Sequence, residues 1–140
     1  MPPRVQYGAL PWQMRDGTLD VLLLTSRGTR RWVIPKGWPH DGLSSAGSAA
    51  QEAFEEAGIA GTITEEPVGT YHYEKVRDQG GCVDCIVYVH ALNVTEQLED
   101  WPERGERELR WFPRHEAAGQ VSEAGLRDLI LKYSPPVPYS

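Results

Sequence analysis

Three glutamates occupy one short stretch of the sequence and could together bind a divalent cation. Glu52, Glu55 and Glu56 lie within residues 51–59, where alanines recur at helical spacing. On a helix, Glu52 and Glu56 lie about 40° apart and Glu55 lies about 60° from Glu52, so all three share one face. Like charges at this spacing destabilise a helix by roughly 0.2–0.5 kcal/mol. The pattern indicates either a solvated acidic face or a metal site.

The segment that precedes this helix favours the metal site. Pro35-Lys36-Gly37-Trp38-Pro39 is a glycine-bearing loop that directly follows an apolar strand segment. Magnesium typically takes one or two carboxylates together with phosphate oxygens of a substrate. Basic side chains suited to phosphate gather just ahead of the helix, although they could also be solvated loop charges. They are Arg27, Arg30, Arg31 and Lys36, with Lys75 and Arg77 as possible additions.

The elements that would position these residues follow from hydrophobic periodicity and turn residues. Ser44 or Ser45 can cap the acidic helix and Gly58 can end it. Pro11 suggests that the first strand is an edge strand or carries a bulge. The pattern predicts strands at 5–14, 19–25, 31–34, 62–76, 82–94 and 109–112, helices at 44–57 and 122–132, and a loop at 100–105. This order predicts an α+β domain in which helices cover a mixed sheet.

Length and composition restrict the class of protein. The 140 residues and 15.7 kDa suffice for one domain, expected as a body over residues 5–133 with a proline-rich C-terminal tail. Fourteen basic and twenty acidic residues give a net charge of −6 and a pI near 5.2, which argues against a nucleic-acid partner. No apolar run is long enough to span a membrane, and the N-terminus lacks the hydrophobic block of a signal peptide. We therefore expect a soluble, cytoplasmic protein.

The acidic stretch resembles the signature of the Nudix hydrolases. That signature reads Gly, five residues, Glu, seven residues, then Arg-Glu-apolar-x-Glu-Glu-x-Gly-apolar. Gly37 and the run Glu52-x-x-Glu55-Glu56-x-Gly58-Ile59 match it. Residues 31–37 resemble the strand and loop that enter the signature, and Arg110-Trp111-Phe112-Pro113 followed by a helix resembles the family's ending. The resemblance implies a Nudix-type α/β/α sandwich over residues 5–133, with a mixed sheet flanked by helices.

The resemblance also implies a reaction, the hydrolysis of a diphosphate linkage. Glu52, Glu56 and the backbone carbonyl of Gly37 would hold Mg²⁺ or Mn²⁺, and Glu55 is the candidate general base. A glutamate of a later loop could take that role instead, the choices being Glu99, Glu103, Glu106 and Glu108. The likeness is greatest to the branch with diphosphoinositol polyphosphate and diadenosine polyphosphate hydrolases. The expected substrate is thus a polyphosphorylated small molecule, with Ser26, Arg27, Arg31 and Lys36 as candidate binding residues.

Two positions depart from the family signature. Leu43 stands where the family has its first Glu, and Gln51 stands where it has Arg. In the family these two residues are usually described as supporting the loop and the helix through charge pairing. Losing both together is therefore coherent, because keeping one alone would leave a partly buried charge unpaired. We expect the metal site to be retained; the alternatives are a non-catalytic nucleotide-binding module and a pyrophosphatase for nucleotide sugars or nucleoside triphosphates. Trp38 is a possible substrate contact, and His40 and Asp41 are interpreted as plain loop residues. The oligomeric state, monomer or homodimer, stays open.

Overall fold

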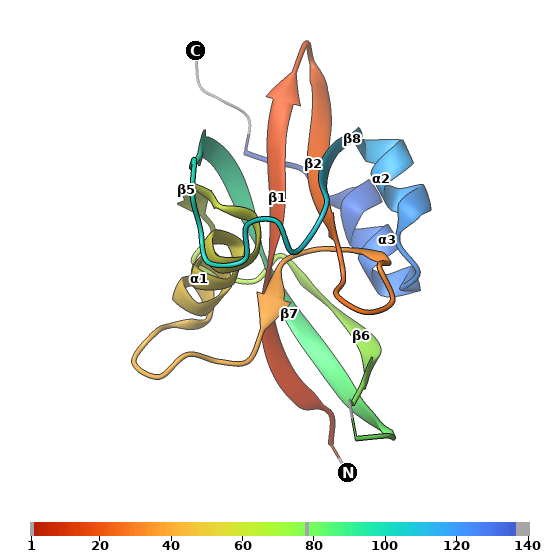
Figure 1. Cartoon of the computed structure of the whole chain (residues 1–140). Helices are drawn as coiled ribbons and strands as arrows, with labels where there is room; N and C mark the ends of the chain where they lie inside the picture. The colour runs from red at the N-terminus through yellow and green to blue at the C-terminus, as the bar shows by residue number, and fades with distance from the viewer. Residues whose placement is uncertain (1, 78, 137–140) are drawn as a thin grey trace.

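The chain folds into one mixed sheet with helices on both of its faces (Figure 1). The computed structural model describes residues 2–77 and 79–136, so residues 137–140 of the expected tail lie outside the described residues. Its strands are β1 (Arg4–Arg15), β2 (Thr18–Thr25), β3 (Trp32–Val33), β4 (Lys36–Gly37), β5 (Ile59–Ile63), β6 (Gly69–Val76), β7 (Cys82–Gln97) and β8 (Leu109–Pro113). Its helices are α1 (Ser45–Ala57), α2 (Arg114–Gln120) and α3 (Ala124–Lys132).

The 16-residue strand β7 organises one half of the sheet. It pairs in parallel with β1, and antiparallel with β5 along one part of its length and β6 along another. The single strand expected over residues 62–76 is therefore wrong. Pro67 lies in the irregular segment between β5 and β6, and Thr64 Oγ1 donates a hydrogen bond to the carbonyl of Glu66 in the turn there.

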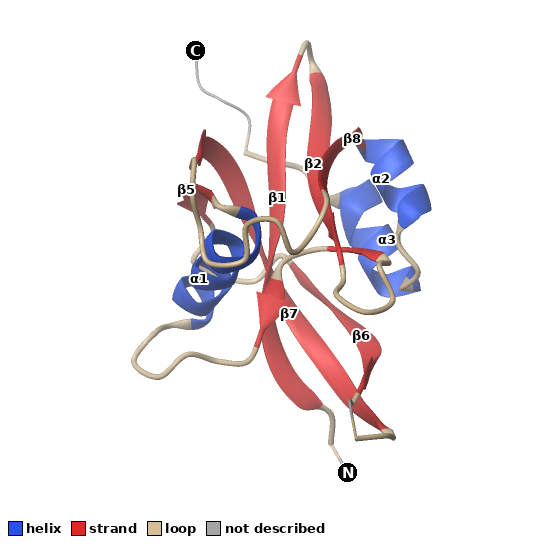
Figure 2. Ribbon diagram, viewed as in Figure 1, coloured by secondary structure: helices blue, strands red, loops and turns tan. Residues whose placement is uncertain are grey.

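Strand residues alternate between two hydrophobic cores because both faces of the sheet are covered (Figure 2). In β2, Leu22 and Leu24 belong to the core beneath α1, whereas Val21 and Leu23 belong to the opposite core. Three alanines of α1 let the helix approach the sheet closely, and α2 and α3 pack on the other face. This arrangement confirms the expected α/β/α sandwich with a mixed sheet.

Two details of the sheet differ from the expectation. Strand β1 lies inside the sheet between β2 and β7, so it is not an edge strand. Pro11 fits there because it lies between the part of β1 that pairs with β4 and the part that pairs with β2. The helix expected at 122–132 is α3, and α2 follows Pro113 directly, as the resemblance implied. Within the described residues, none of the helices has the length and apolar character needed to span a bilayer.

Candidate active site

Helix α1 presents two of its glutamates to a cavity. Its N-cap, Ser44, accepts a hydrogen bond from the backbone N of Gly47 at 3.0 Å, and Gly58 ends the helix in the left-handed conformation with φ of 65°. The alanine side of the helix is buried against the sheet. Glu52 and Glu56 are only 8% and 7% exposed and line the cavity. The helix thus holds two carboxylates, one turn apart, at the wall of an opening.

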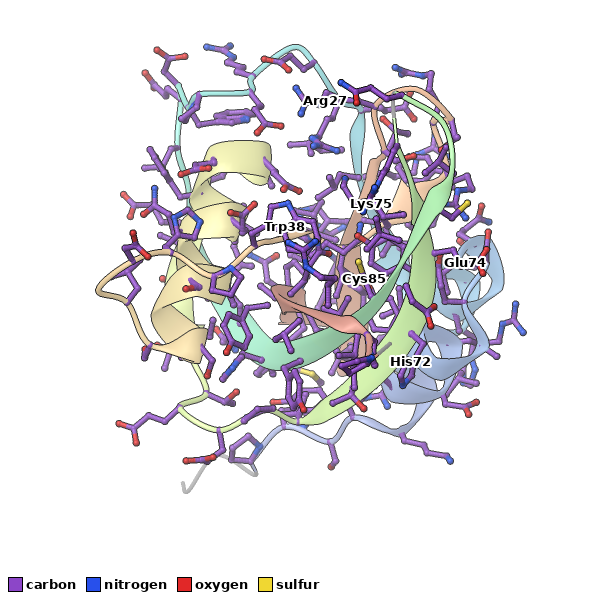
Figure 3. The ribbon with its side chains drawn as sticks, turned by 90° about the horizontal axis from the view of Figure 1, so that it is seen from below. Arg27, Trp38, His72, Glu74, Lys75 and Cys85 are labelled. Carbon is purple, nitrogen blue, oxygen red and sulfur yellow. The ribbon has the colours of Figure 1, made fainter. Side chains whose placement is uncertain are left out.

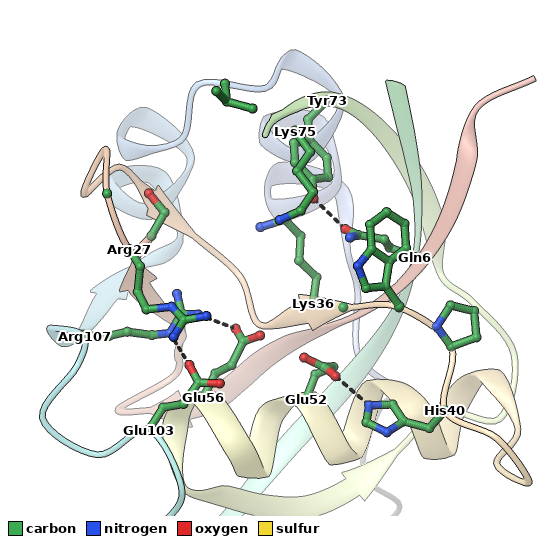
Figure 4. A pocket seen from close by; sticks show the side chains of 16 residues that line it. Gln6, Arg27, Lys36, His40, Glu52, Glu56, Tyr73, Lys75, Glu103 and Arg107 are labelled. Carbon is green, nitrogen blue, oxygen red and sulfur yellow. Dashed lines mark hydrogen bonds and ion pairs between the residues drawn. The ribbon is translucent and has the colours of Figure 1, made fainter. Parts of the chain in front are cut away.

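The cavity has a volume of about 810 Å³ and combines acidic and basic side chains (Figure 4). It brings together Gly37, Glu52 and Glu56, the residues that sequence analysis assigned to the metal. Ser26, Arg27 and Lys36, three of the four candidate substrate residues, also line it. Viewed from below, Trp38 and Lys75 lie between α1 and β6, with Arg27 towards one end (Figure 3). The cavity is also lined by Gln6, His40, Tyr73, Glu103 and Arg107.

The carboxylate of Glu52 is held from two sides. His40 Nε2 lies 2.6 Å from Glu52 Oε2. On the other side, the carboxylate packs against the Cα of Gly37, where a Cβ would overlap it. This close approach explains why the position requires glycine, and it places the Gly37 backbone beside the carboxylate.

The carboxylate of Glu56 faces an arginine from the loop before β8. Arg107 Nη2 lies 3.9 Å from Glu56 Oε1, and Arg107 is itself held by Glu103 Oε1 at 3.0 Å and the carbonyl of Thr25 at 3.2 Å. Burial, and then the neighbouring Glu52 carboxyl, raise the pKa of Glu56 to about 8, although Arg107 and Lys36 oppose the shift. Burial therefore disfavours the charged form of Glu56 by more than the nearby cations favour it.

Lys36 forms the basic wall opposite the carboxylates. Its Nζ lies 4.9 Å from the ring centroid of Tyr73, whose hydroxyl donates a hydrogen bond to Gln6 Oε1 at 2.6 Å. Burial lowers the pKa of Lys36, and the charge of Glu56 opposes that change. An ammonium group so placed can contact a phosphate that enters the cavity.

Two predicted site residues lie elsewhere. Arg31 lines a smaller hollow of about 380 Å³, where its Nη1 lies 3.5 Å from Glu123 Oε2. Glu55 does not line the main cavity; its Oε2 accepts a hydrogen bond from Gln51 Nε2 at 2.8 Å. Its carboxylate still lies near the other two groups, since ligand atoms of His40, Glu52 and Glu55 all fall within 4.8 Å of one another.

The donor set fits a hard divalent cation. The Glu52 carboxylate packs against the Gly37 backbone, and the buried Glu56 carboxyl lines the same cavity, where a bound cation would favour its charged form. Sequence reasoning missed the contacts of His40 and Arg107. Both belong to loops, where no periodicity indicates which way a side chain points, and the sequence carries no signal for either contact.

Comparisons with known proteins identify the family. The NUDIX domain family model matches residues 2–132, so the chain belongs to the Nudix family. "Nudix hydrolase 12, mitochondrial" of Arabidopsis thaliana is 42% identical over 105 residues, covering 71% of this chain and 50% of that protein. "Diphosphoinositol polyphosphate phosphohydrolase 3-beta" of Bos taurus is 34% identical over 101 residues, covering 70% of this chain and 57% of the relative.

A solved structure shares the fold. The crystal structure of the Caenorhabditis elegans Ap4A hydrolase superposes with a TM-score of 0.68 at 22% identity, covering 94% of this chain and 96% of the other. The chain spans about half the length of curated relatives that it matches. The comparisons thus show the family and the fold.

Proposed function

We propose that the chain hydrolyses a diphosphate linkage in a nucleoside or inositol polyphosphate and uses Mg²⁺ or Mn²⁺ for this. The observation that carries the proposal is the single cavity in which Glu52 and Glu56 face Lys36, Lys75 and Arg27. Carboxylates with the Gly37 carbonyl suit the cation, and the basic groups suit the phosphates that would accompany it.

The chain's own groups divide into cation-binding and phosphate-binding sets. A divalent cation, when bound, neutralises charge on the phosphoryl oxygens and polarises a water molecule. Glu52, Glu56 and the Gly37 carbonyl would hold it. Lys36 and Lys75 would contact the substrate's phosphates as point charges. Arg27 Nη1 donates a hydrogen bond to Glu106 Oε1 at 3.0 Å, and the other N–H groups of the guanidinium can bind a phosphate.

The general base is one of two carboxylates. Glu55 lies close to Glu52 and has the neutral Gln51 amide as its partner. Of the four acidic loop residues considered from sequence, Glu103 lines the cavity. A general base contributes typically 10²–10⁴-fold to the rate. We assign the role to Glu55, so Glu55→Gln should lower kcat by about this factor. If Glu103→Gln lowers kcat by this factor and Glu55→Gln leaves it nearly unchanged, the general base is Glu103.

The substrate proposal draws on the relatives and on the cavity together. Diphosphoinositol polyphosphates and dinucleoside polyphosphates are the molecules named for two of the similar proteins. Both carry runs of phosphate, and the proposed cation site and the basic wall can bind several phosphate groups at once. We therefore place the substrate among polyphosphorylated small molecules of these two kinds.

A substrate panel tests the proposal. Diphosphoinositol polyphosphates, diadenosine polyphosphates, nucleotide sugars and nucleoside triphosphates are incubated with the protein in Mg²⁺, in Mn²⁺ and in EDTA, and released phosphate species are measured. We expect metal-dependent cleavage of the first two groups and none by Glu56→Gln. Metal-dependent binding without cleavage of any compound would instead identify a non-catalytic module, the alternative that the loss of the signature residues at Leu43 and Gln51 favours.

A further inference from the structure

The loop that follows β4 carries a histidine whose position is fixed at its backbone and at its ring. The backbone N of His40 donates a hydrogen bond to Ser48 Oγ at 3.0 Å, and its carbonyl accepts one from the backbone N of Leu43 at 3.1 Å. Ser48 is fully buried in α1. The ring then reaches Glu52 Oε2 at 2.6 Å (Figure 4). The loop is therefore tied to the helix at two successive turns.

The contact leaves Glu52 little freedom. Its carboxylate lies between the His40 ring on one side and the Gly37 backbone on the other, and its side chain is only 11% exposed. An ionised carboxylate only accepts hydrogen bonds, so the imidazole must donate from Nε2. Because Oε2 already accepts this bond, we expect Oε1 to be the oxygen that binds a cation.

Each glutamate of α1 has a different partner. Gln51 holds Glu55, Arg107 faces Glu56, and His40 holds Glu52. Neither residue that replaces the family's usual pair, Leu43 or Gln51, has a hydrogen bond to Glu52 in the described structure. His40 is thus the side chain that orients the first carboxylate of the metal site.

We propose that His40 is a positioning residue, which holds the Glu52 carboxylate in the orientation that binds the divalent cation. This inference rests on the proposed metal-dependent function. Residues that hydrogen-bond to a metal ligand typically contribute 10–100-fold to metal affinity. A direct ligand role is a distinct hypothesis with a different outcome, because an imidazole that bound the cation itself would still contribute to affinity after Glu52 is replaced.

The test measures binding of Mn²⁺ alone, without substrate, by electron paramagnetic resonance of the free ion. We expect His40→Ala to raise the Kd for Mn²⁺ at least about tenfold. His40→Gln places an amide donor near the position of Nε2 and is expected to remain within about threefold of the unmodified protein. His115→Ala, on the exposed surface of α2 across the sheet, is the matched control and should bind as the unmodified protein does. In the Glu52→Gln background, His40→Ala should cause no further loss.

The outcomes separate the inference from the proposed function. If the unmodified protein binds no Mn²⁺, both fall. If it binds Mn²⁺ and His40→Ala binds equally well, only the inference falls. His40→Gln as weak as His40→Ala also overturns it. A further loss caused by His40→Ala in the Glu52→Gln background would overturn it in favour of direct ligation. Urea unfolding checks that each variant folds. If His40→Ala fails to fold, Ser48→Ala is used instead, because it removes the hydrogen bond that holds the backbone of His40. Unchanged Mn²⁺ affinity in a folded Ser48→Ala protein would then overturn the inference.

Discussion

Glu56 is the residue whose replacement most directly tests the electrostatics of the site. Burial and the neighbouring Glu52 raise its pKa from the ordinary 4.5 to about 8. The folded protein therefore holds this proton more tightly than the unfolded chain does. Its contribution to stability is complete below the unfolded pKa and is lost as the pH rises through the folded pKa. Glu56→Gln retains the shape of the protonated side chain but cannot ionise, so this loss should disappear.

The size of the effect follows from the two pKa values. Between them, the folded state carries about one extra proton, which changes the free energy of unfolding by about 1.4 kcal/mol per pH unit. Between pH 5 and pH 8 the free energy of unfolding of the metal-free protein should therefore fall by about 3 kcal/mol through this group. Solvent screening reduces this value little, because the Glu56 side chain is only 8% exposed. The stability of Glu56→Gln relative to the unmodified protein should rise by the same amount over that range.

Urea unfolding in EDTA at pH 5 and pH 8 measures this difference. Glu74→Gln, on the exposed surface of β6, is the matched control and should follow the unmodified protein at both pH values. Mg²⁺ at a hundred times its Kd should stabilise the unmodified protein at pH 8 by about 2.7 kcal/mol and leave Glu56→Gln unchanged. A stability difference between Glu56→Gln and the unmodified protein that stays constant across the pH range would refute the claim that ionising Glu56 is costly.

Four further substitutions test other parts of the site. Gly37→Ala puts a Cβ into the Glu52 carboxylate, so the Kd for Mn²⁺ should rise about tenfold in a variant that urea unfolding shows to be folded; unaltered Mn²⁺ binding would contradict this. Arg107→Met leaves Glu103 without its cation and the carbonyl of Thr25 without a donor, and should cost about 3 kcal/mol in urea unfolding at pH 7, where a cost below about 1 kcal/mol would show that the pair is unimportant. Lys75→Ala should raise KM about tenfold for a polyphosphate substrate with little change in kcat, and a fall in kcat alone would show a different role. Gly58→Ala forces a side chain into a backbone with φ of 65° and into the Trp101 ring, so it should lower the free energy of unfolding by about 2 kcal/mol, and a neutral result would argue against that packing.

The carboxylate helix was predictable because its signals are local. Serine at the start, glycine at the end and alanines at helical spacing define α1, and the same spacing places Glu52 and Glu56 on one face. The alternation of buried residues in β2 between two cores also follows from strand geometry once helices cover both faces. These features depend on residues a few positions apart.

The contacts that complete the site depend on the path of loops. His40 meets a residue twelve positions away and Arg107 comes from the loop before β8, so neither contact has a periodic signature. The separation of β5 from β6 was missed because residues 62–76 are rich in strand formers, although Pro67 marks the interruption. Arg31 was grouped with Arg27 because the two lie close in sequence, yet the turn between them directs Arg31 to Glu123.

The two departures from the Nudix signature change how the charge on α1 is balanced. Leu43 is 48% exposed and Gln51 donates a neutral hydrogen bond to Glu55, so neither replacement buries an unpaired charge. An amide orients a carboxylate without offsetting its charge, which leaves Arg107 and Lys36 as the cations that face Glu56. Burial keeps the pKa of Glu56 raised despite these two cations, so its buried carboxylate is favoured by a proton or by a bound cation. The folding stability of this chain should therefore depend on the divalent ion at neutral and alkaline pH.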